Sequence, residues 1–468
     1  MSILKNTSIY TLGNLFPAIA GFLLLPVYSR YLAPEEYAVI ASMEVIAYLY
    51  GTFVNFNLER ASYRFYFDKN DVQWRNNLFF TIHYASIFFT IFWLLVILAF
   101  QDLIALVFPS ISFWPFFMLV LGRVTLEVVL RTPQQYFQVT EQPLAYVSIS
   151  IIKLLVSLSF ILWFLVVRDA GAQGVLAGSL IGSAFMIPVG IYVGHRYFKG
   201  KFDRKILYDA LRFTWPFIPS LIIAWVLDLS DRVFLEHYAS REQLGLYGMA
   251  YKIASAYFIL MGAYITAYLP RYYKFANLED QELASKTLAK DAKINTLLHL
   301  SLLMLMFLWC YEGILYFLSG EYSETTDIIR ILLVSHFFAS LPAVTFTPAI
   351  LQVKKTKVSM YTAIAAAIIN IALNFYLIPK YGMYGASIAT VISMVVLFFL
   401  LWSVSKKSYL VDFPWRILLL SMVIGSSILG VFIFVLDESS ILTSLIKLVV
   451  TILILIVLSN YFKKYVVS

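Results

Sequence analysis

The sequence has 468 residues, of which 61% are hydrophobic and only 13% are charged, and its mean hydropathy is +0.81. A soluble domain has roughly 25% charged residues, so this chain carries more apolar surface than a soluble core could bury. The formal net charge of +8 lies in short connecting segments, which argues against nucleic-acid binding. A single cysteine, Cys310, excludes an intrachain disulfide and a cysteine-based metal site.

Continuous apolar segments of transmembrane length recur along the whole chain. Each is long enough to cross a hydrocarbon layer of about 30 Å as an α-helix, whereas a transmembrane barrel would show alternating strands. We therefore expect an all-α polytopic membrane protein with about 14 transmembrane helices. In chain order the predicted spans are 8–29, 38–57, 78–100, 113–132, 144–167, 175–195, 213–236, 247–269, 292–316, 328–350, 358–378, 385–405, 415–436 and 441–461.

The Lys and Arg residues of the connecting segments predict the orientation of the chain. When the segments are assigned to alternate sides, 25 of the 35 Lys and Arg residues fall on one side and five on the other. Cytoplasmic loops are enriched in Lys and Arg, so both termini are expected in the cytoplasm. Lys5, Lys354, Lys355, Lys407, Lys463 and Lys464 belong to the basic side.

Three short patterns recur in the two halves of the chain. Pro17 and Arg30 correspond to Pro219 and Arg232, QV at 138–139 corresponds to QV at 352–353, and GAQG at 171–174 corresponds to GMYG at 382–385. Their order and spacing predict two parallel six-helix repeats. We expect an N-terminal lobe over 1–200, a C-terminal lobe over 201–408 and two additional helices over 409–468. The basic loop 195–212 would divide the lobes.

Charged side chains inside the predicted spans are candidates for a substrate site, because charge is costly in lipid and normally faces a cavity or a partner. Arg123, Glu127 and Arg131 share one helix face, and Glu127 is a candidate partner for a cation. Arg123 is predicted to line a cavity, and Arg131 to lie at the membrane interface. Lys153, about 15 Å deep at 1.5 Å per residue, is expected to line the cavity or to pair with Glu127.

Lys252 and Arg330 are further candidate cavity cations, although both lie close enough to the outer face to extend toward water. His336 lies mid-span and is either a hydrogen-bonded core residue or a site of proton coupling. Lys447 is expected to extend to the membrane surface, since its helix lies outside the repeats.

A second group of charges lies near the predicted outer ends of the first and seventh spans. Its members are Arg30, Asp228, Asp231 and Arg232, with Glu44 as a further candidate partner. They form either a structural charge cluster or an outer gate. The glycines at 174, 178, 182, 190 and 194 fall on nearly one helix face and predict close helix packing.

Sequence motifs of enzymes are missing from the chain. It has neither the phosphate-binding loop of nucleotide hydrolases nor a metalloprotease motif, and its five histidines are scattered. We therefore expect a transporter that is not an enzyme, with no catalytic residues, no metal site and no cofactor.

The N-terminal stretch TSIYTLGNLFPAIAGFLLLPVYSRYLAPEEYAVI resembles the start of polysaccharide-biosynthesis (Wzx/RfbX-type) flippases, a branch of the multidrug/oligosaccharidyl-lipid/polysaccharide (MOP) exporter superfamily. The LSDRVFLEHY and LGLYGMAYKI segments and the glycines at 382 and 385 extend the resemblance over nearly the whole chain. It implies two lobes in a V-shaped, MATE-like arrangement and alternating access. It also implies coupling to a proton or sodium gradient.

The resemblance implies translocation of an undecaprenyl-pyrophosphate-linked oligosaccharide across the cytoplasmic (inner) membrane of a bacterium, for O-antigen, capsule or exopolysaccharide synthesis. The predominance of cations inside the membrane agrees with a diphosphate cargo. Expected partners are the lipid-linked glycan, the bilayer, and the polymerase and chain-length regulator of the same pathway, with no nucleic acid. The alternatives are a MATE-type drug/cation antiporter, a peptidoglycan lipid-precursor flippase of the same fold and a membrane-embedded glycan polymerase.

Overall fold

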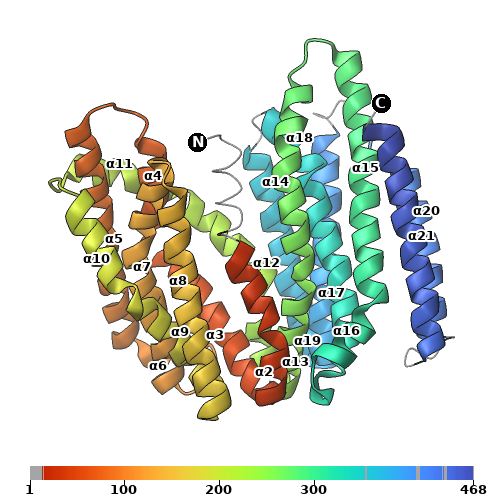
Figure 1. Cartoon of the computed structure of the whole chain (residues 1–468), viewed down its shortest axis with the longest axis horizontal. Helices are drawn as coiled ribbons and strands as arrows, with labels where there is room; N and C mark the ends of the chain where they lie inside the picture. Colours follow the sequence, from red (N-terminus) through yellow and green to blue (C-terminus); the bar gives the residue numbers. More distant parts are fainter. Residues whose placement is uncertain are drawn as a thin grey trace. The chain divides into compact units, whose positions relative to one another are not determined.

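A computed structural model describes residue 13 and residues 15–353, 356–406, 412–434, 436 and 440–466 (Figure 1). The described residues form helices, turns and connecting segments, with no β-strand among them. The chain divides by its internal contacts into two compact units, unit 1 at Met1–Gly248 and unit 2 at Met249–Ser468. The predicted lobe boundaries stay a prediction.

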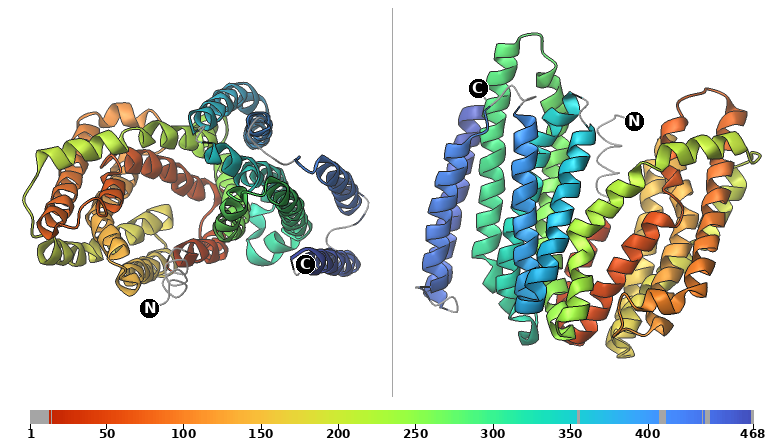
Figure 2. Two further views of the ribbon diagram at one scale, coloured as in Figure 1. Left: turned by 90° about the horizontal axis from the view of Figure 1, so that it is seen from above. Right: turned by 180° about the vertical axis from the view of Figure 1, so that it is seen from behind.

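Unit 1 is a bundle of apolar helices joined by short turns (Figure 1). Most of these helices run alongside one another, whereas α11 lies across the ends of α4 and α5 (Figure 2). Its helices are α2 (Leu25–Tyr31), α3 (Pro34–Phe53), α4 (Leu58–Phe65), α5 (Val72–Ala99), α6 (Gln101–Ala105), α7 (Met118–Val139), α8 (Pro143–Leu162), α9 (Gly171–Phe185), α10 (Ile187–Tyr197), α11 (Arg204–Thr214) and α12 (Phe217–Tyr238), and α13 (Arg241–Ala254) contains the division between the units.

Unit 2 is a second helical bundle, in which α17 packs against α15 and α19. The pair α20 and α21 lies against α15 at one side of the unit (Figure 1). The helices of this unit are α14 (Ala256–Ala276), α15 (Gln281–Leu308), α16 (Cys310–Phe317), α17 (Thr325–Ser340), α18 (Phe346–Gln352), α19 (Thr356–Ser405), α20 (Trp415–Phe434) and α21 (Ile441–Val466).

The described residues contain 11 helices that are long and apolar enough to cross a membrane, or 12 if the bent pair α3–α4 is one span. The all-helical membrane fold is therefore confirmed. The first predicted span begins outside the described residues, and predicted spans eleven and twelve appear as one helix, α19, that bends at Gly382. The total of 14 and the cytoplasmic termini stay predictions. Lys5, Lys354, Lys355 and Lys407 lie outside what the structure describes, and Lys463 and Lys464 lie in the last turns of α21.

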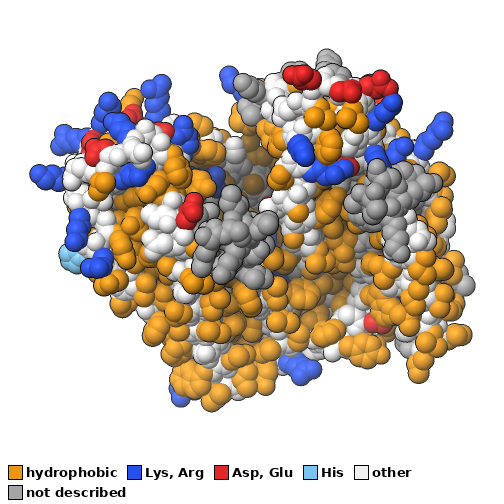
Figure 3. All heavy atoms as spheres, turned by 45° about the horizontal axis from the view of Figure 1, so that its top comes forward, with side chains coloured by type: hydrophobic (Ala, Val, Ile, Leu, Met, Phe, Trp, Pro, Cys, Tyr) orange, Lys and Arg blue, Asp and Glu red, His pale blue; other side chains and the backbone are white. Residues whose placement is uncertain are grey.

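Side chains of different kinds occupy different parts of each unit. Lys and Arg side chains gather at the upper end of each unit in Figure 3, and hydrophobic side chains cover the sides below. This is the distribution expected of helices that cross a lipid layer and end in water. The apolar sides include many large exposed residues, such as Phe88 and Leu95 on α5.

The glycines of the predicted sixth span are packing positions, as expected. A Cβ on Gly178 would collide with the backbone of Ile161, and one on Gly182 would collide with the side chain of Ser157. Because these glycines have no side chain, α9 can approach α8 closely. This approach also brings Ser183 of α9 within reach of the charged residues on α7.

The prediction that Lys447 extends to the membrane surface is wrong. Lys447 is 0% exposed, and its Nζ lies 2.9 and 3.1 Å from the two carboxylate oxygens of Glu312 on α16. Ser444 donates to the same carboxylate, and the indole of Trp309 donates to Thr451 at 2.9 Å. These polar contacts join α21 to α16 and to the end of α15. They could not be predicted from a single lysine in an apolar helix.

Candidate functional site

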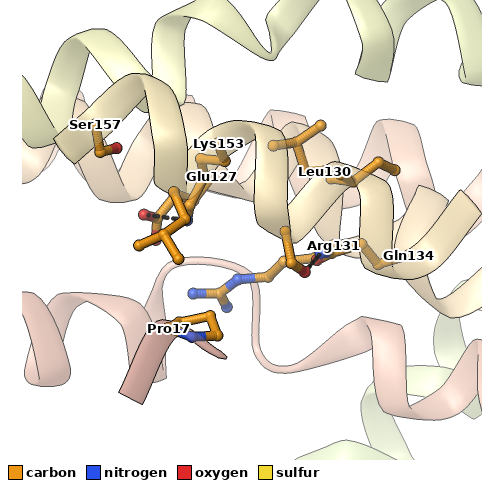
Figure 4. Close-up of a pocket in the computed structure, with 10 residues that line it drawn as sticks. Pro17, Glu127, Leu130, Arg131, Gln134, Lys153 and Ser157 are labelled. Carbon is orange, nitrogen blue, oxygen red and sulfur yellow. Dashed lines mark hydrogen bonds and ion pairs between the residues drawn. The ribbon is translucent and has the colours of Figure 1, made fainter. Parts of the chain in front are cut away.

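Unit 1 contains a cavity of about 260 Å³ between α7, α8 and the apolar helix Leu15–Tyr31, of which α2 is the last part (Figure 4). Helix α7 contributes charged residues at intervals of four, so they share one face of the helix. Helix α8 begins at Pro143, which occupies its first turn, and places Lys153 opposite that face. The cavity is lined by Pro17, Glu127, Leu130, Arg131, Gln134, Ile149, Ser150, Lys153, Leu154 and Ser157.

Glu127 is the carboxylate at the centre of this site. Its Oε1 lies 2.9 Å from Lys153 Nζ and 3.4 Å from Arg123 Nη1. The hydroxyl of Ser183 donates to the same oxygen at 3.3 Å. The structure therefore brings together three residues predicted from the sequence. Lys153 both pairs with Glu127 and lines the cavity, whereas Arg123, which was predicted to line a cavity, pairs with Glu127 and is not among the residues that line this one.

Arg131 is a cavity residue that the sequence analysis placed at the membrane interface. Its guanidinium donates to the carbonyl of Gly51 at 3.3 Å and to Asn55 Oδ1 at 3.2 Å. Glu59 lies farther away, with its Oε1 at 3.9 Å, and its Oε2 accepts a hydrogen bond from the Asn55 amide at 2.8 Å. Arg131 is thus positioned largely by neutral oxygens.

The partners of Arg131 become available because the second predicted span is broken. Helices α3 and α4 meet at an angle of 49°. Between them Phe56 and Asn57 adopt positive φ angles of 52° and 55°, which interrupts the helical hydrogen bonds. Broken helices are tolerated in membranes where the freed backbone groups find partners. The two asparagines within an apolar span were the signal for this break.

Three cations and two carboxylates make up the charges of this site. Arg123, Arg131 and Lys153 carry positive charge, and Glu127 and Glu59 carry negative charge, which leaves one positive charge in excess. Both cavity-lining cations are partly accessible, with side chains 25% and 33% exposed for Arg131 and Lys153. The site can therefore attract an anion without first breaking every ion pair.

The predicted gate residues of unit 1 occupy different environments. Arg232 is 2% exposed and joins α12 to α3, with Nη1 3.2 Å from Glu44 Oε2 and 3.3 Å from the carbonyl of Ala41. Asp231 is also 2% exposed and accepts a hydrogen bond from the hydroxyl of Tyr247 on α13. Asp228 is half-buried, whereas Arg30 is exposed in the last turn of α2. Their role as a gate stays a prediction.

The candidate residues of unit 2 lie on two helices, Lys252 on α13 and Arg330 and His336 on α17. The Arg330 side chain is 7% exposed, lies 3.5 Å from Asp327 and faces the ring of Phe307. His336 is 2% exposed, contacts Ser335 through Nδ1 and stacks on Phe258. Lys252 is half-buried in the last turn of α13. Among the residues that the structure describes, no group of His, Cys, Asp or Glu side chains could hold a metal ion.

A family model described as polysaccharide biosynthesis protein matches residues 3–276, which is more than half of the chain. The chain belongs to the polysaccharide biosynthesis protein family. A second model, MatE, matches residues 216–376. Both matches place this family member in the superfamily that the N-terminal motifs indicated.

Three proteins are related to this family member at 22–25% sequence identity. An uncharacterized membrane protein of Methanocaldococcus jannaschii is 25% identical over 47% of this chain and 54% of its own length. A protein of Shigella flexneri provisionally named as an O-antigen transporter is 22% identical over 47% of this chain and 50% of its own. The chain thus spans about half the length of these two relatives. A protein of the Lsg locus of Haemophilus influenzae is 22% identical over 87% of this chain and 100% of its own.

Solved structures share the fold of this family member. The lipid II flippase MurJ, in an inward closed conformation, superposes over 100% of both chains with a TM-score of 0.78 and 15% identity. An inward-facing multidrug resistance MATE family transporter of the MOP superfamily covers 84% of this chain and 96% of its own, with a TM-score of 0.63 and 15% identity. These likenesses establish the MOP-type fold.

Proposed function

We propose that the protein is a flippase that moves an undecaprenyl-diphosphate-linked oligosaccharide across the cytoplasmic membrane of a bacterium by alternating access. The observation that carries the proposal is the excess of positive charge around the unit 1 cavity, where Glu127 is shared by Arg123 and Lys153. A diphosphate is the charged part of such a lipid-linked sugar. Family membership supports the polysaccharide pathway, and O-antigen, capsule or exopolysaccharide would be its product.

The chemistry of the cavity fits a diphosphate better than a cationic drug. Arg131 offers a planar guanidinium that can bind two phosphate oxygens at once, and Lys153 offers a point charge that can leave Glu127 for a phosphate. The cavity of about 260 Å³ is slightly smaller than sites for drug-sized ligands, which occupy roughly 300–1,000 Å³. It would hold the diphosphate, while the sugars and the polyprenyl tail lie elsewhere.

The proposed transport also needs a source of energy and proteins that receive the product. A proton or sodium gradient would drive the step, with His336 as a candidate coupling residue. The polymerase and chain-length regulator of the same pathway would receive the flipped product. The protein itself would break no covalent bond of its cargo.

A peptidoglycan lipid precursor is the second candidate cargo. The likeness to the lipid II flippase MurJ over the full length of the chain favours it. Both cargoes carry the same undecaprenyl diphosphate, so the proposed role of the cavity is common to both. The two differ in the sugars and in the consequence of losing the protein.

The experiment is deletion of the gene, followed by complementation with Lys153→Ala, Arg131→Ala and, as a control, Arg168→Ala. Arg168 is exposed in the same unit and outside the cavity. We expect deletion to abolish surface polysaccharide and to accumulate lipid-linked repeat units, and only the control to restore export at normal protein levels.

Other outcomes would contradict parts of this proposal. Arrest of cell-wall synthesis with accumulated lipid II would replace the polysaccharide cargo with the peptidoglycan precursor. Unchanged polysaccharide together with altered drug sensitivity would support an antiporter. Full export by both cavity variants would show that the unit 1 cavity does not bind the diphosphate.

A further inference from the structure

Unit 1 carries a strongly basic surface that the transport site does not use. The segment 196–215 contains six Lys and Arg residues and two Asp residues, a net charge of +4. It begins in the last turn of α10 and includes α11, at the end of the unit where Lys and Arg side chains gather (Figure 3). From the sequence, this segment was predicted to be only a boundary loop between the lobes and a determinant of orientation.

Helix α11 is amphipathic and lies across the end of the bundle. Ile206, Ala210 and Thr214 are buried, and the first two belong to a core cluster with α4 and α5. Figure 2 shows α11 lengthwise in the view from above, in which the spans of unit 1 appear end-on. A helix in this position lies in the plane of a membrane surface, with one face on the protein and the other facing outward.

The segment before α11 is held firmly against the start of α5. The backbone N–H of Lys201 donates to Asn77 Oδ1 at 2.8 Å, and that of Asp203 donates to Thr81 Oγ1 at 2.9 Å. Asp203 then caps α11 by accepting from the N–H groups of Lys205 and Ile206. One of the two acids of the segment, Asp203, therefore binds backbone N–H groups. The backbone that carries the cations is held in place by these hydrogen bonds and by those to α5.

The exposed cations of this segment are not paired with a carboxylate among the residues that the structure describes. Lys199, Lys201, Arg204, Lys205 and Arg212 are exposed, and within the described part of the chain none of their side chains has a hydrogen bond or ion pair. In contrast, Lys286 at the start of α15 pairs with Glu282, and Arg271 binds Asp291 through two hydrogen bonds.

Exposed aromatic side chains lie among these cations. Phe202, Tyr208 and Trp215 are 50%, 64% and 62% exposed. Aromatic side chains are enriched at the level of lipid head groups, where one part of the ring contacts acyl chains and another faces water. Cations at that level attract acidic lipids within a Debye length.

We propose that segment 196–215 is a binding surface for acidic phospholipids of the leaflet that this end of unit 1 faces. The charge asymmetry of the loops predicts that this is the cytoplasmic leaflet. Phosphate groups of the lipids supply the counter-charge for Lys199, Lys201 and Lys205, and Trp215 and Tyr208 lie at the level of the glycerol backbone. The proposal does not depend on the identity of the transported cargo.

The test uses the full chain reconstituted in nanodiscs that contain phosphatidylcholine and a minority of brominated phosphatidylglycerol. Bromine quenches nearby indoles, and the difference between the protein and its Trp215→Phe variant isolates the signal of Trp215. We expect phosphatidylglycerol to be enriched around Trp215 and the enrichment to fall in 1 M salt. Brominated phosphatidylcholine at the same fraction gives the quenching of Trp215 that is expected when the lipid is not enriched around the protein.

The variant that tests the surface is Lys199→Gln/Lys201→Gln/Lys205→Gln, and its matched control is Lys274→Gln/Lys286→Gln/Lys293→Gln. All six lysines are exposed, and the control removes the same number of charges from α14 and α15. We expect about a tenfold or greater loss of phosphatidylglycerol enrichment in the first variant and none in the second. Equal quenching by the two lipids, or equal loss in both triple variants, would overturn the proposal.

Discussion

Gly171 and Gly382 have nearly the same positive φ angle, 54° and 53°, at corresponding positions of the two predicted sequence repeats. Each glycine lies between the fifth and the sixth predicted span of its half. Each is followed three residues later by a second glycine, Gly174 or Gly385, at which a Cβ would collide with the preceding helix. The two copies of this short glycine pattern therefore share a backbone feature as well as a sequence pattern.

Replacing either glycine with alanine should destabilise the protein. A side chain at such a φ costs about 1–3 kcal/mol, and at position 171 the new Cβ would also meet the carboxylate of Glu36. We expect Gly171→Ala and Gly382→Ala to lower the melting temperature of the purified protein. Gly262→Ala is the control, because no atom lies within 4 Å of a Cβ there. Equal melting of all three variants would show that the turn does not need glycine.

Arg232 should matter more for stability than Arg30, although the two occupy corresponding places in the sequence repeats. Arg232 is buried against Glu44 and the carbonyl of Ala41, whereas Arg30 is exposed. We expect Arg232→Met to lose about 1–3 kcal/mol of stability through the broken hydrogen bonds, and Arg30→Met to change it by less than about 0.5 kcal/mol. Thermal unfolding followed by tryptophan fluorescence would measure both, and a larger effect at Arg30 would refute this assignment.

The Lys447–Glu312 pair should couple α21 to α16. Removing one partner leaves a buried charge, which costs about 3–5 kcal/mol in protein interiors. We expect Lys447→Met and Glu312→Leu to be strongly destabilised, and the double variant to recover much of the loss. Unfolding of the four proteins in a double-mutant cycle would measure the coupling. Additive losses in the double variant would mean that the two side chains do not interact.

The sequence was sufficient to predict the helical membrane fold, because apolar runs of fixed length leave few alternatives. It also predicted that Glu127 is a candidate partner for Lys153, since both are charged and lie within neighbouring spans. These predictions depend on local composition and spacing, which a single sequence contains.

The structure was needed where a side chain depends on a partner far away in the chain. Lys447 looked like a surface-seeking lysine until Glu312, 135 residues earlier, proved to be its partner. Arg131 looked interfacial because the break between α3 and α4 was not recognised, and that break supplies its acceptors. Helix α11 was read as a loop because basic residues are frequent in segment 195–212, although Asp203 is a good N-cap.

The central claim is that the unit 1 cavity binds a diphosphate through cations that Glu127 only partly neutralises. The most direct measurement is the affinity of purified protein for undecaprenyl diphosphate in the native form and in the variants Lys153→Gln and Glu127→Gln. We predict that Lys153→Gln weakens binding about tenfold or more, because a charge-assisted hydrogen bond is lost, and that Glu127→Gln binds at least as tightly as the native protein. Equal weakening by both variants, or no change in either, would contradict the account.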